Sequence, residues 1–188
     1  MLKEKLKNYN IILASKSPRR QQFFKDLDLD FNNLKSKAFN NLSEKDLLIT
    51  SDTIVWLENK ALAEKDLLIT SDTIVWLENK ALGKPKNETD AFKMLQSLSG
   101  KKHQVITSIS IKGKNFQKII NDVTFVYFKK LSDEEINFYI KNYQPFDKAG
   151  GYGIQEWIGF IGIDKIEGNY FNVVGLPVHK LYKELMKL

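Results

Sequence analysis

Two adjacent arginines near the start of the chain are the first residues whose types and spacing indicate chemistry. Residues 11–14 (IILA) form a short apolar run, and residues 15–20 (SKSPRR) follow it directly. Ser17 is a favourable N-cap and Pro18 suits the first helical position, so the pattern predicts a strand, a turn and a helix start. Arg19 and Arg20 then lie in the first helical turn, where the helix dipole disfavours cations by about 0.3–1 kcal/mol each. A solvated basic turn would explain them, but an anion shared by the arginines, Ser15 and the free helix amides explains them better.

A carboxylate and a lysine further along the chain could complete such a site. Asp72 lies in the apolar stretch at residues 67–77 (LLITSDTIVWL), where an uncompensated carboxylate would be costly to bury. Lys84 follows in Gly83-Lys84-Pro85. Taken singly, Asp72 could be a strand-end carboxylate and Lys84 an exposed loop cation. Together with the arginines they indicate a phosphate site with a carboxylate for Mg²⁺ or for an attacking water.

A glycine-rich segment is the third candidate. Residues 147–155 (DKAGGYGIQ) place three glycines close together, which allows a ligand to approach the backbone closely. Gln155 offers both a donor and an acceptor, which suits a nucleobase edge or a phosphate oxygen. The segment could also be only a turn, and it does not match the P-loop pattern. His103 and His179 have no metal-ligand spacing around them, and we interpret both as structural.

Helices and strands alternate along the rest of the chain, which predicts an α/β domain built on a mixed twisted sheet with flanking helices. A helix is expected from Asn87 or Thr89 to residue 98, and Ser132 and Glu135 form a capping box that opens another. We expect a final helix after Pro177. Strands are expected at residues 103–111, 117–129 and 158–166.

Length and composition set broader bounds. The 188 residues suit a single domain spanning 1–188, with two lobes around a cleft. The chain has no cysteine, no signal-peptide pattern and no run long enough to cross a membrane, so we expect a cytoplasmic protein. The net charge is +6, but the lysines are scattered among acidic residues. The charge therefore favours anionic partners without indicating a specific nucleic-acid surface.

One segment is duplicated without change. Residues 44–62 (EKDLLITSDTIVWLENKAL) recur as residues 64–82. Repeat architectures come in longer, diverged series, so the copy does not predict a solenoid. It is typical of a recent duplication or of an error in the sequence, and we treat residues 31–63 as anomalous. An intact mass that matches all 188 residues would exclude the error.

Six motifs in order along the chain resemble one family. SxSPRR, SDTIV, GKP, LSGKKHQVIT, DKAGGYGIQ and NVVGLP are similar to the Maf family of nucleotide pyrophosphatases, long labelled septum-formation proteins. The resemblance implies a fold similar to that of inosine-triphosphate pyrophosphatase. It also implies hydrolysis of nucleoside triphosphates to monophosphate and pyrophosphate with Mg²⁺ or Mn²⁺, a link to cell division, and a homodimer. The SDTIV and DKAGGYGIQ segments resemble the branch that acts on dTTP and UTP, which could extend to modified pyrimidine nucleotides.

The resemblance also assigns roles to single residues. Asp72 would accept the proton of the attacking water, bind the metal, or do both in turn. Phosphate contacts would come from Ser15, Arg19, Arg20, Lys37 and Lys84, and base preference from Arg19, Thr73 and Gln155. Asp52 is the duplicate of Asp72 but has Ala-Glu-Lys where Asp72 has Gly-Lys-Pro, so Asp72 fits the family.

The chain departs from the family before Lys37, because residues 31–37 are much shorter than the corresponding family segment and its acidic residues have no counterpart there. A different class of function therefore stays open. The protein could be a regulator of cell division that binds nucleotides or nucleic acid without turnover. Salt-dependent binding of DNA or RNA, with no pyrophosphate release, would favour this alternative.

Overall fold

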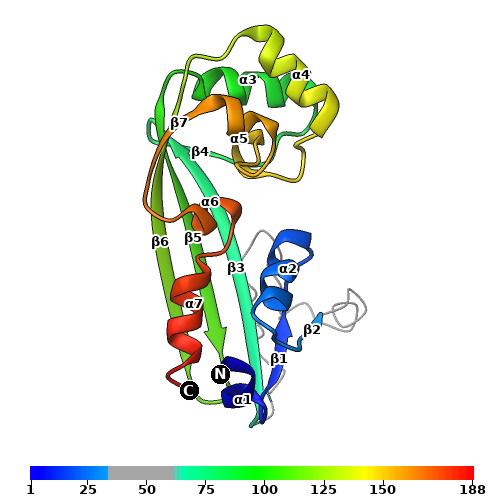
Figure 1. The fold of residues 1–188 in the computed structure, drawn as a ribbon, viewed down its shortest axis with the longest axis vertical. Helices are drawn as coiled ribbons and strands as arrows, with labels where there is room; N and C mark the ends of the chain where they lie inside the picture. Colours follow the sequence, from blue (N-terminus) through cyan, green and yellow to red (C-terminus); the bar gives the residue numbers. More distant parts are fainter. Residues whose placement is uncertain (34–61, 63) are drawn as a thin grey trace, which may run out of the picture. The chain divides into compact units, whose positions relative to one another are not determined.

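The computed structural model describes residues 1–33, 62 and 64–188 (Figure 1). The chain divides into two compact units. The first comprises Met1–Asp72, Ser108–Asn121 and Gly175–Leu188, and the second comprises Thr73–Thr107 and Asp122–Val174. Each unit has its own hydrophobic core. Lys37, Asp52 and the first copy of the duplicated segment lie outside the described residues.

A mixed β-sheet forms the framework, as predicted from the sequence. Its described strands follow the order β2-β1-β3-β5-β6-β7, and β4 pairs with β3. β1 runs parallel to β2 and β3, whereas β4 is antiparallel to β3 and β7 is antiparallel to β6. The strand bounds are β1 Asn10–Leu13, β2 Asn32–Asn33, β3 Asp66–Leu77, β4 Lys80–Leu82, β5 Lys102–Lys112, β6 Gln117–Phe128 and β7 Ile163–Glu167.

The first unit contains three described helices, α1 Leu2–Leu6, α2 Pro18–Asp26 and α7 Val178–Leu185. Phe24 on α2 is fully buried with Leu13 of β1 and Leu181 of α7. Burying a side chain of this size stabilises the folded state by about 1.5–3 kcal/mol. The helix predicted after Pro18 is confirmed, and this packing holds the last turns of α2 in the core with the end of β1.

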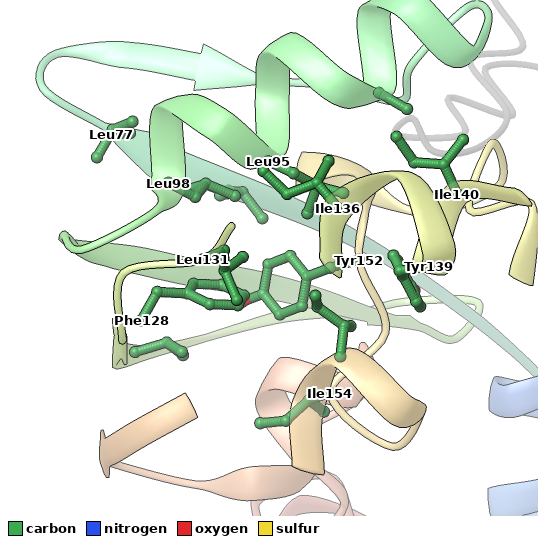
Figure 2. Packing of buried hydrophobic residues seen from close by; sticks show 14 of the residues in the cluster. Leu77, Leu95, Leu98, Phe128, Leu131, Ile136, Tyr139, Ile140, Tyr152 and Ile154 are labelled. Atoms are coloured by element: carbon green, nitrogen blue, oxygen red, sulfur yellow. The ribbon is translucent and has the colours of Figure 1, made fainter. Parts of the chain in front are cut away.

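The second unit contains helices α3 Glu88–Leu98, α4 Asp133–Tyr143, α5 Trp157–Gly162 and α6 Tyr170–Val174, with a 3₁₀ turn at Ala149–Gly151. Its core lies where α3 and α4 meet the glycine-rich segment and the sheet (Figure 2). Tyr152 of that segment points into this core beside Phe128, with ring centroids 5.1 Å apart. The glycine-rich segment is therefore part of a packed core and is held in place by it.

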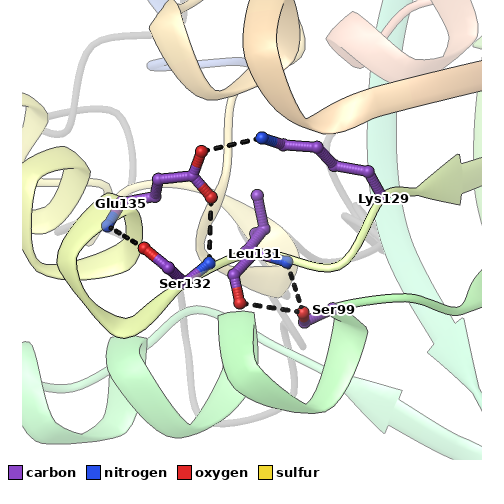
Figure 3. A network of polar contacts seen from close by, with 5 residues as sticks. All are labelled: Ser99, Lys129, Leu131, Ser132 and Glu135. Atoms are coloured by element: carbon purple, nitrogen blue, oxygen red, sulfur yellow. Dashed lines mark hydrogen bonds and ion pairs between the residues drawn. The ribbon is translucent and has the colours of Figure 1, made fainter.

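The beginning of α4 carries the predicted capping box (Figure 3). The Ser132 hydroxyl accepts from the Glu135 amide at 3.2 Å, and the Glu135 carboxylate accepts from the Ser132 amide at 2.9 Å. The same carboxylate pairs with Lys129 at 2.7 Å, and the lysine's hydrogen bond is the main reason that the pKa of Glu135 is lowered. Next to this box, the Leu131 amide donates to the Ser99 hydroxyl at 2.7 Å, which links the end of α3 to the start of α4.

One predicted element is wrong. Residues 158–166 were expected to form a strand, but residues up to Gly162 belong to α5 and the strand begins only at Ile163. The Glu156 carbonyl accepts hydrogen bonds from the amides of Gly159 and Phe160, which starts a helix within the apolar run. The helix at Glu88–Leu98 and the strands β5 and β6 agree with the sequence analysis to within one or two residues.

None of the helices in the described parts of the chain combines the length and the apolar character needed to cross a membrane.

Candidate active site

Strand pairing in the first unit places the segments of Ser15 and Asp72 on adjacent parallel strands. β1 and β3 are parallel, with Leu13 beside Ile69, and the Ala14 amide donates to the Ile69 carbonyl at 3.0 Å. Each candidate residue follows these paired positions by a few residues in its own strand direction. Ser15 follows the carboxyl end of β1, the kind of position where α/β proteins place ligands, whereas Asp72 lies inside the longer strand β3.

Arg20 and the SDTIV segment meet at one backbone carbonyl. The Arg20 Nε donates to the Gly175 carbonyl at 2.9 Å, and the Ser71 hydroxyl donates to the same oxygen at 3.4 Å. Arg20 is only 6% exposed although it is charged. The structure thus joins the SPRR, SDTIV and NVVGLP motifs, which are far apart in the sequence. The bond to Gly175 uses one of the five guanidinium donors and orients the Arg20 side chain.

The turn before α2 is held by Ser15. The Ser17 amide donates to the Ser15 hydroxyl at 3.2 Å, and the Gln21 side chain donates to the Ser15 carbonyl at 3.1 Å. Ser17 occupies the N-cap position as predicted, and Pro18 begins the helix, but the Ser17 side chain makes no capping hydrogen bond. Arg19 is half-buried beside it. The turn is therefore ordered by Ser15, a role that the sequence did not indicate.

Metal binding was expected at Asp72, which is half-buried. Within residues 1–33 and 64–188, no group of three or more His, Cys, Asp or Glu side chains is arranged to hold a metal ion. Mg²⁺ is commonly held by one or two carboxylates together with substrate phosphates and waters. A single carboxylate such as Asp72 therefore fits a metal that arrives with a nucleotide.

In the second unit, the Gly83-Lys84-Pro85 turn contacts the glycine-rich segment. The Gly150 amide donates to the Gly83 carbonyl at 2.9 Å. Gly150 has a φ of +71°, and a Cβ there would lie 2.9 Å from a methyl group of Val75, so only glycine suits the position. The glycine-rich segment consequently packs against β3 two residues after Thr73, beside the turn that presents the exposed Lys84.

The glycine-rich segment also contains a buried lysine, Lys148, with two carboxylate partners. The sequence analysis did not identify these ion pairs. Lys148 is 8% exposed, and its amine lies 3.0 Å from Glu156 and 2.7 Å from Asp147. The Glu156 carboxylate also accepts from the Tyr139 hydroxyl, which accepts in turn from the Gly153 amide at 2.9 Å. Burial, followed by the bond to Glu156, raises the pKa of the Tyr139 phenol. The network holds both ends of residues 148–156, and so fixes the backbone that presents the half-buried Gln155.

Thr73 takes part in a second buried network of this unit. Its hydroxyl lies 3.0 Å from that of Thr107, and the Thr107 hydroxyl donates to the Asn172 carbonyl at 3.0 Å. Thr107 and Asn172 are fully buried, whereas Thr73 is partly accessible. Thr107 ends the LSGKKHQVIT motif and Asn172 begins the NVVGLP motif, but the sequence analysis assigned no role to either residue.

The predicted site residues thus fall into two groups. Ser15, Arg19, Arg20 and Asp72 belong to the first unit, and their segments meet around the end of β1 and the Gly175 carbonyl. Thr73, Lys84 and Gln155 belong to the second unit, around the glycine-rich segment. Lys37 lies outside the described residues. The catalytic, metal and substrate roles assigned to these residues remain predictions.

Comparison with known proteins identifies the family. The sequence model of the family described as Maf-like protein matches residues 10–188. The chain belongs to the Maf family. It is 53% identical to a Christiangramia forsetii protein named dTTP/UTP pyrophosphatase, over all of this chain and 98% of that protein. It is 55% identical to a protein of the same name from Flavobacterium johnsoniae, over the whole of both chains.

A third relative with this name, from Flavobacterium psychrophilum, is 56% identical over 99% of the chain and 98% of its own length. The alignments with the first two relatives extend over 213 positions, although this chain has 188 residues. These relatives therefore contain residues with no counterpart here. This finding is in keeping with the shortened segment that the sequence analysis inferred before Lys37.

Proposed function

We propose that this Maf protein is a nucleoside triphosphate pyrophosphatase that hydrolyses dTTP and UTP to the monophosphate and pyrophosphate. The observation that carries the proposal is the identity of 53–56%, over nearly the full chain, to three relatives named dTTP/UTP pyrophosphatase. The geometry supports it independently, since Ser15 and two arginines at a helix start follow β1, and the half-buried Asp72 lies in the adjacent parallel strand β3.

The reaction proposed is the attack of water on the α-phosphorus. A bond forms between the water oxygen and the α-phosphorus, and the bond to the bridging oxygen of the β-phosphate breaks, which releases pyrophosphate. Asp72 accepts a proton from the water, and Ser15, Arg19, Arg20, Lys37 and Lys84 bind the phosphate oxygens. Cations placed where negative charge develops stabilise the transition state, and no covalent intermediate is needed.

A divalent cation, Mg²⁺ or Mn²⁺, is the proposed cofactor. Asp72 would hold it, and the metal would supply charge neutralisation on the phosphates when bound. Base preference is assigned to Arg19, Thr73 and Gln155. Activity on modified pyrimidine nucleotides, a link to cell division, a homodimer and a cytoplasmic location are further parts of the proposal, each carried by the family or the composition.

The test is pyrophosphate release from dTTP, UTP, CTP, GTP and 7-methyl-GTP with Mg²⁺ or Mn²⁺, for the wild type and for Asp72→Ala. We expect turnover of dTTP and UTP, and a loss of about 10²- to 10⁴-fold in kcat for the variant, since a general base contributes that much. Asp66→Asn is a matched control on the same strand, because Asp66 accepts a hydrogen bond from Asn10 and lies outside the proposed machinery. It should retain activity.

Two results would contradict the proposal. Substantial activity of Asp72→Ala would remove Asp72 from the role of base. No turnover of any nucleotide by folded protein would favour the alternative, a regulator that binds nucleotides or nucleic acid. In that case, binding of DNA or RNA should weaken steeply with salt, because phosphate contacts release counterions.

A further inference from the structure

The direction of the hydrogen bonds around Thr73 follows from simple counting. A threonine hydroxyl has one hydrogen to donate, and a backbone carbonyl can only accept. The Thr107 hydroxyl donates its hydrogen to the Asn172 carbonyl at 3.0 Å. In the 3.0 Å contact between the two threonine hydroxyls, Thr107 must therefore accept and Thr73 must donate.

The acceptor end of this chain is held firmly. The Asn172 side-chain amide donates to the Val105 carbonyl at 3.0 Å and to the Thr124 hydroxyl at 2.8 Å. Its backbone amide donates to the Asn169 side chain at 3.1 Å. Asn172 is fully buried, so water does not compete for these bonds. The Asn172 carbonyl stays aimed at Thr107, and the polarity of both threonine hydroxyls is set by the fold.

This polarity determines what Thr73 can offer to a ligand. Because its hydrogen is directed to Thr107, the Thr73 oxygen presents lone pairs and acts as an acceptor. Uracil and thymine carry a hydrogen on N3, whereas cytosine has a bare lone pair there. A hydroxyl that acts as an acceptor can bind the N3–H of uracil or thymine. With cytosine, its lone pair would face the lone pair on N3, and no hydrogen bond could form. A polar group left facing the wrong partner is a strong source of discrimination.

We infer that Thr107 and Asn172 are positioning residues for base selection, which hold the Thr73 hydroxyl as an acceptor for the N3–H of uracil or thymine. The inference rests on the proposed function, which assigns Thr73 a part in base preference, and it makes Thr73 a direct contact of the base. It adds two residues that touch no substrate themselves, and it gives a physical reason for preferring dTTP and UTP over the cytidine nucleotides.

The test compares Thr107→Val with Thr107→Ser. Valine has nearly the shape of threonine but no hydroxyl, so the Thr73 hydrogen becomes able to turn toward a ligand. We expect the preference for UTP over CTP, as a ratio of kcat/KM, to fall by about tenfold. Serine keeps the relay and should restore the preference. Ser110→Ala, on the same strand but half-buried and outside this hydrogen-bond chain, is the unrelated control.

Binding gives a second readout that does not need turnover. The affinities of non-hydrolysable UTP and CTP analogues, measured by calorimetry, should show the same loss of preference in Thr107→Val. An unfolding curve checks that this variant is folded. Equal losses for both nucleotides would mean that Thr107 is merely structural, and an unchanged ratio would mean that it does not set selection; either result overturns the inference.

The proposed function and the inference can fail separately. If the wild type binds the analogues but releases no pyrophosphate, the proposed activity fails, and the ratio of affinities still decides the role of Thr107. If the wild type hydrolyses UTP and CTP equally well, the inference fails while the activity stands. If it binds no nucleotide, both are overturned.

Discussion

At the scale of single residues, the buried His103 makes the stability of the second unit's core depend on pH. Its ring is 2% exposed, and Nε2 lies 2.7 Å from the Tyr152 hydroxyl. The ring also stacks on Phe128, with centroids 5.5 Å apart. Burial lowers the pKa of His103 from 6.5 to about 4, because a charged imidazole would lose its hydration. The folded protein therefore keeps this histidine neutral, in agreement with the structural role expected from the sequence.

This shift predicts a loss of stability in mild acid. Below the unfolded-state pKa of 6.5 the unfolded chain binds a proton that the folded chain does not, until the pH approaches 4. Stability from this group is thus complete above pH 6.5 and declines as the pH falls toward 4. The linkage gives a loss of about 2 kcal/mol between roughly pH 7.5 and pH 5.

Urea unfolding of the wild type and of His103→Gln at these two pH values measures the effect. The wild type should lose more stability than the variant, by about the amount given by linkage. Because all other titrating groups are common to both proteins, their contributions cancel in the difference. Equal losses in the two proteins would show that His103 is not the group responsible.

Single residues also show what the sequence could and could not predict of the site. Ser15, Arg20 and Asp72 could be proposed as site residues because a local motif surrounds each of them. The partners that orient such residues are distant in sequence: Gly175 accepts from Arg20 across a separation of 155 residues. Thr107 lies in the LSGKKHQVIT motif but received no role for the same reason, since a threonine in an alternating strand has no local signal of its partner.

At the scale of elements, the start of α4 is determined by residues that are close together in the sequence. The Ser132 and Glu135 side chains satisfy two backbone amides that the helix itself leaves without partners. Lys129 adds an ion pair to the same carboxylate at 2.7 Å (Figure 3). All these residues lie within a few positions of one another, so the sequence pattern was sufficient to predict the cap.

We expect Ser132→Ala to lower the free energy of unfolding by about 1 kcal/mol, because the Glu135 amide loses its acceptor at the N-cap. Ser132→Thr retains a hydroxyl and should cost much less. Urea unfolding measures both variants. If alanine and threonine cost the same, the effect would come from the volume of the side chain and the cap would contribute nothing.

The α5 and β7 segment shows the limit of local patterns. Residues 157–163 (WIGFIGI) are almost continuously apolar, and such a run has neither the strand period nor the helical period. The choice between the two structures is made by tertiary contacts. Ile158 and Gly162 are buried, and Ile163 pairs with Phe128 of β6 in the sheet. A helix as short as α6 was likewise beyond what periodicity can detect.

At the scale of the whole molecule, the duplicated segment raises the question of which copy supplies the site. Strand β3 is formed by the second copy, Asp66–Leu77, and is followed by the Gly83-Lys84-Pro85 turn. The mixed sheet was predictable because sequence patterns indicate the order of helices and strands along most of the chain. The division into two cores could not be read from any local pattern, since β3, β5 and β6 contribute residues to both units.

The identical copies allow a direct comparison of two aspartates. We expect Asp52→Ala to leave the hydrolysis of dTTP unchanged, whereas Asp72→Ala lowers kcat by about 10²- to 10⁴-fold, because only Asp72 precedes the Gly-Lys-Pro turn. Pyrophosphate release measures both variants under the same conditions. A loss in Asp52→Ala as large as that in Asp72→Ala would show that the first copy contributes to catalysis.

The pairing of β1 has a consequence for how this protein folds. β1 matches Asn10–Leu13 with Asp66–Ile69, a DLLI sequence that also occurs at residues 46–49. The sequence that pairs with β1 is identical in the two copies, so this pairing alone does not distinguish them. Only residues outside the duplication do so, such as Gly83, whose carbonyl accepts from the Gly150 amide. We therefore expect residues 46–49 to compete with β3 for pairing with β1 during folding, a form of frustration that natural sequences generally avoid. The duplication is therefore expected to affect the rate and yield of folding more than the stability of the folded protein.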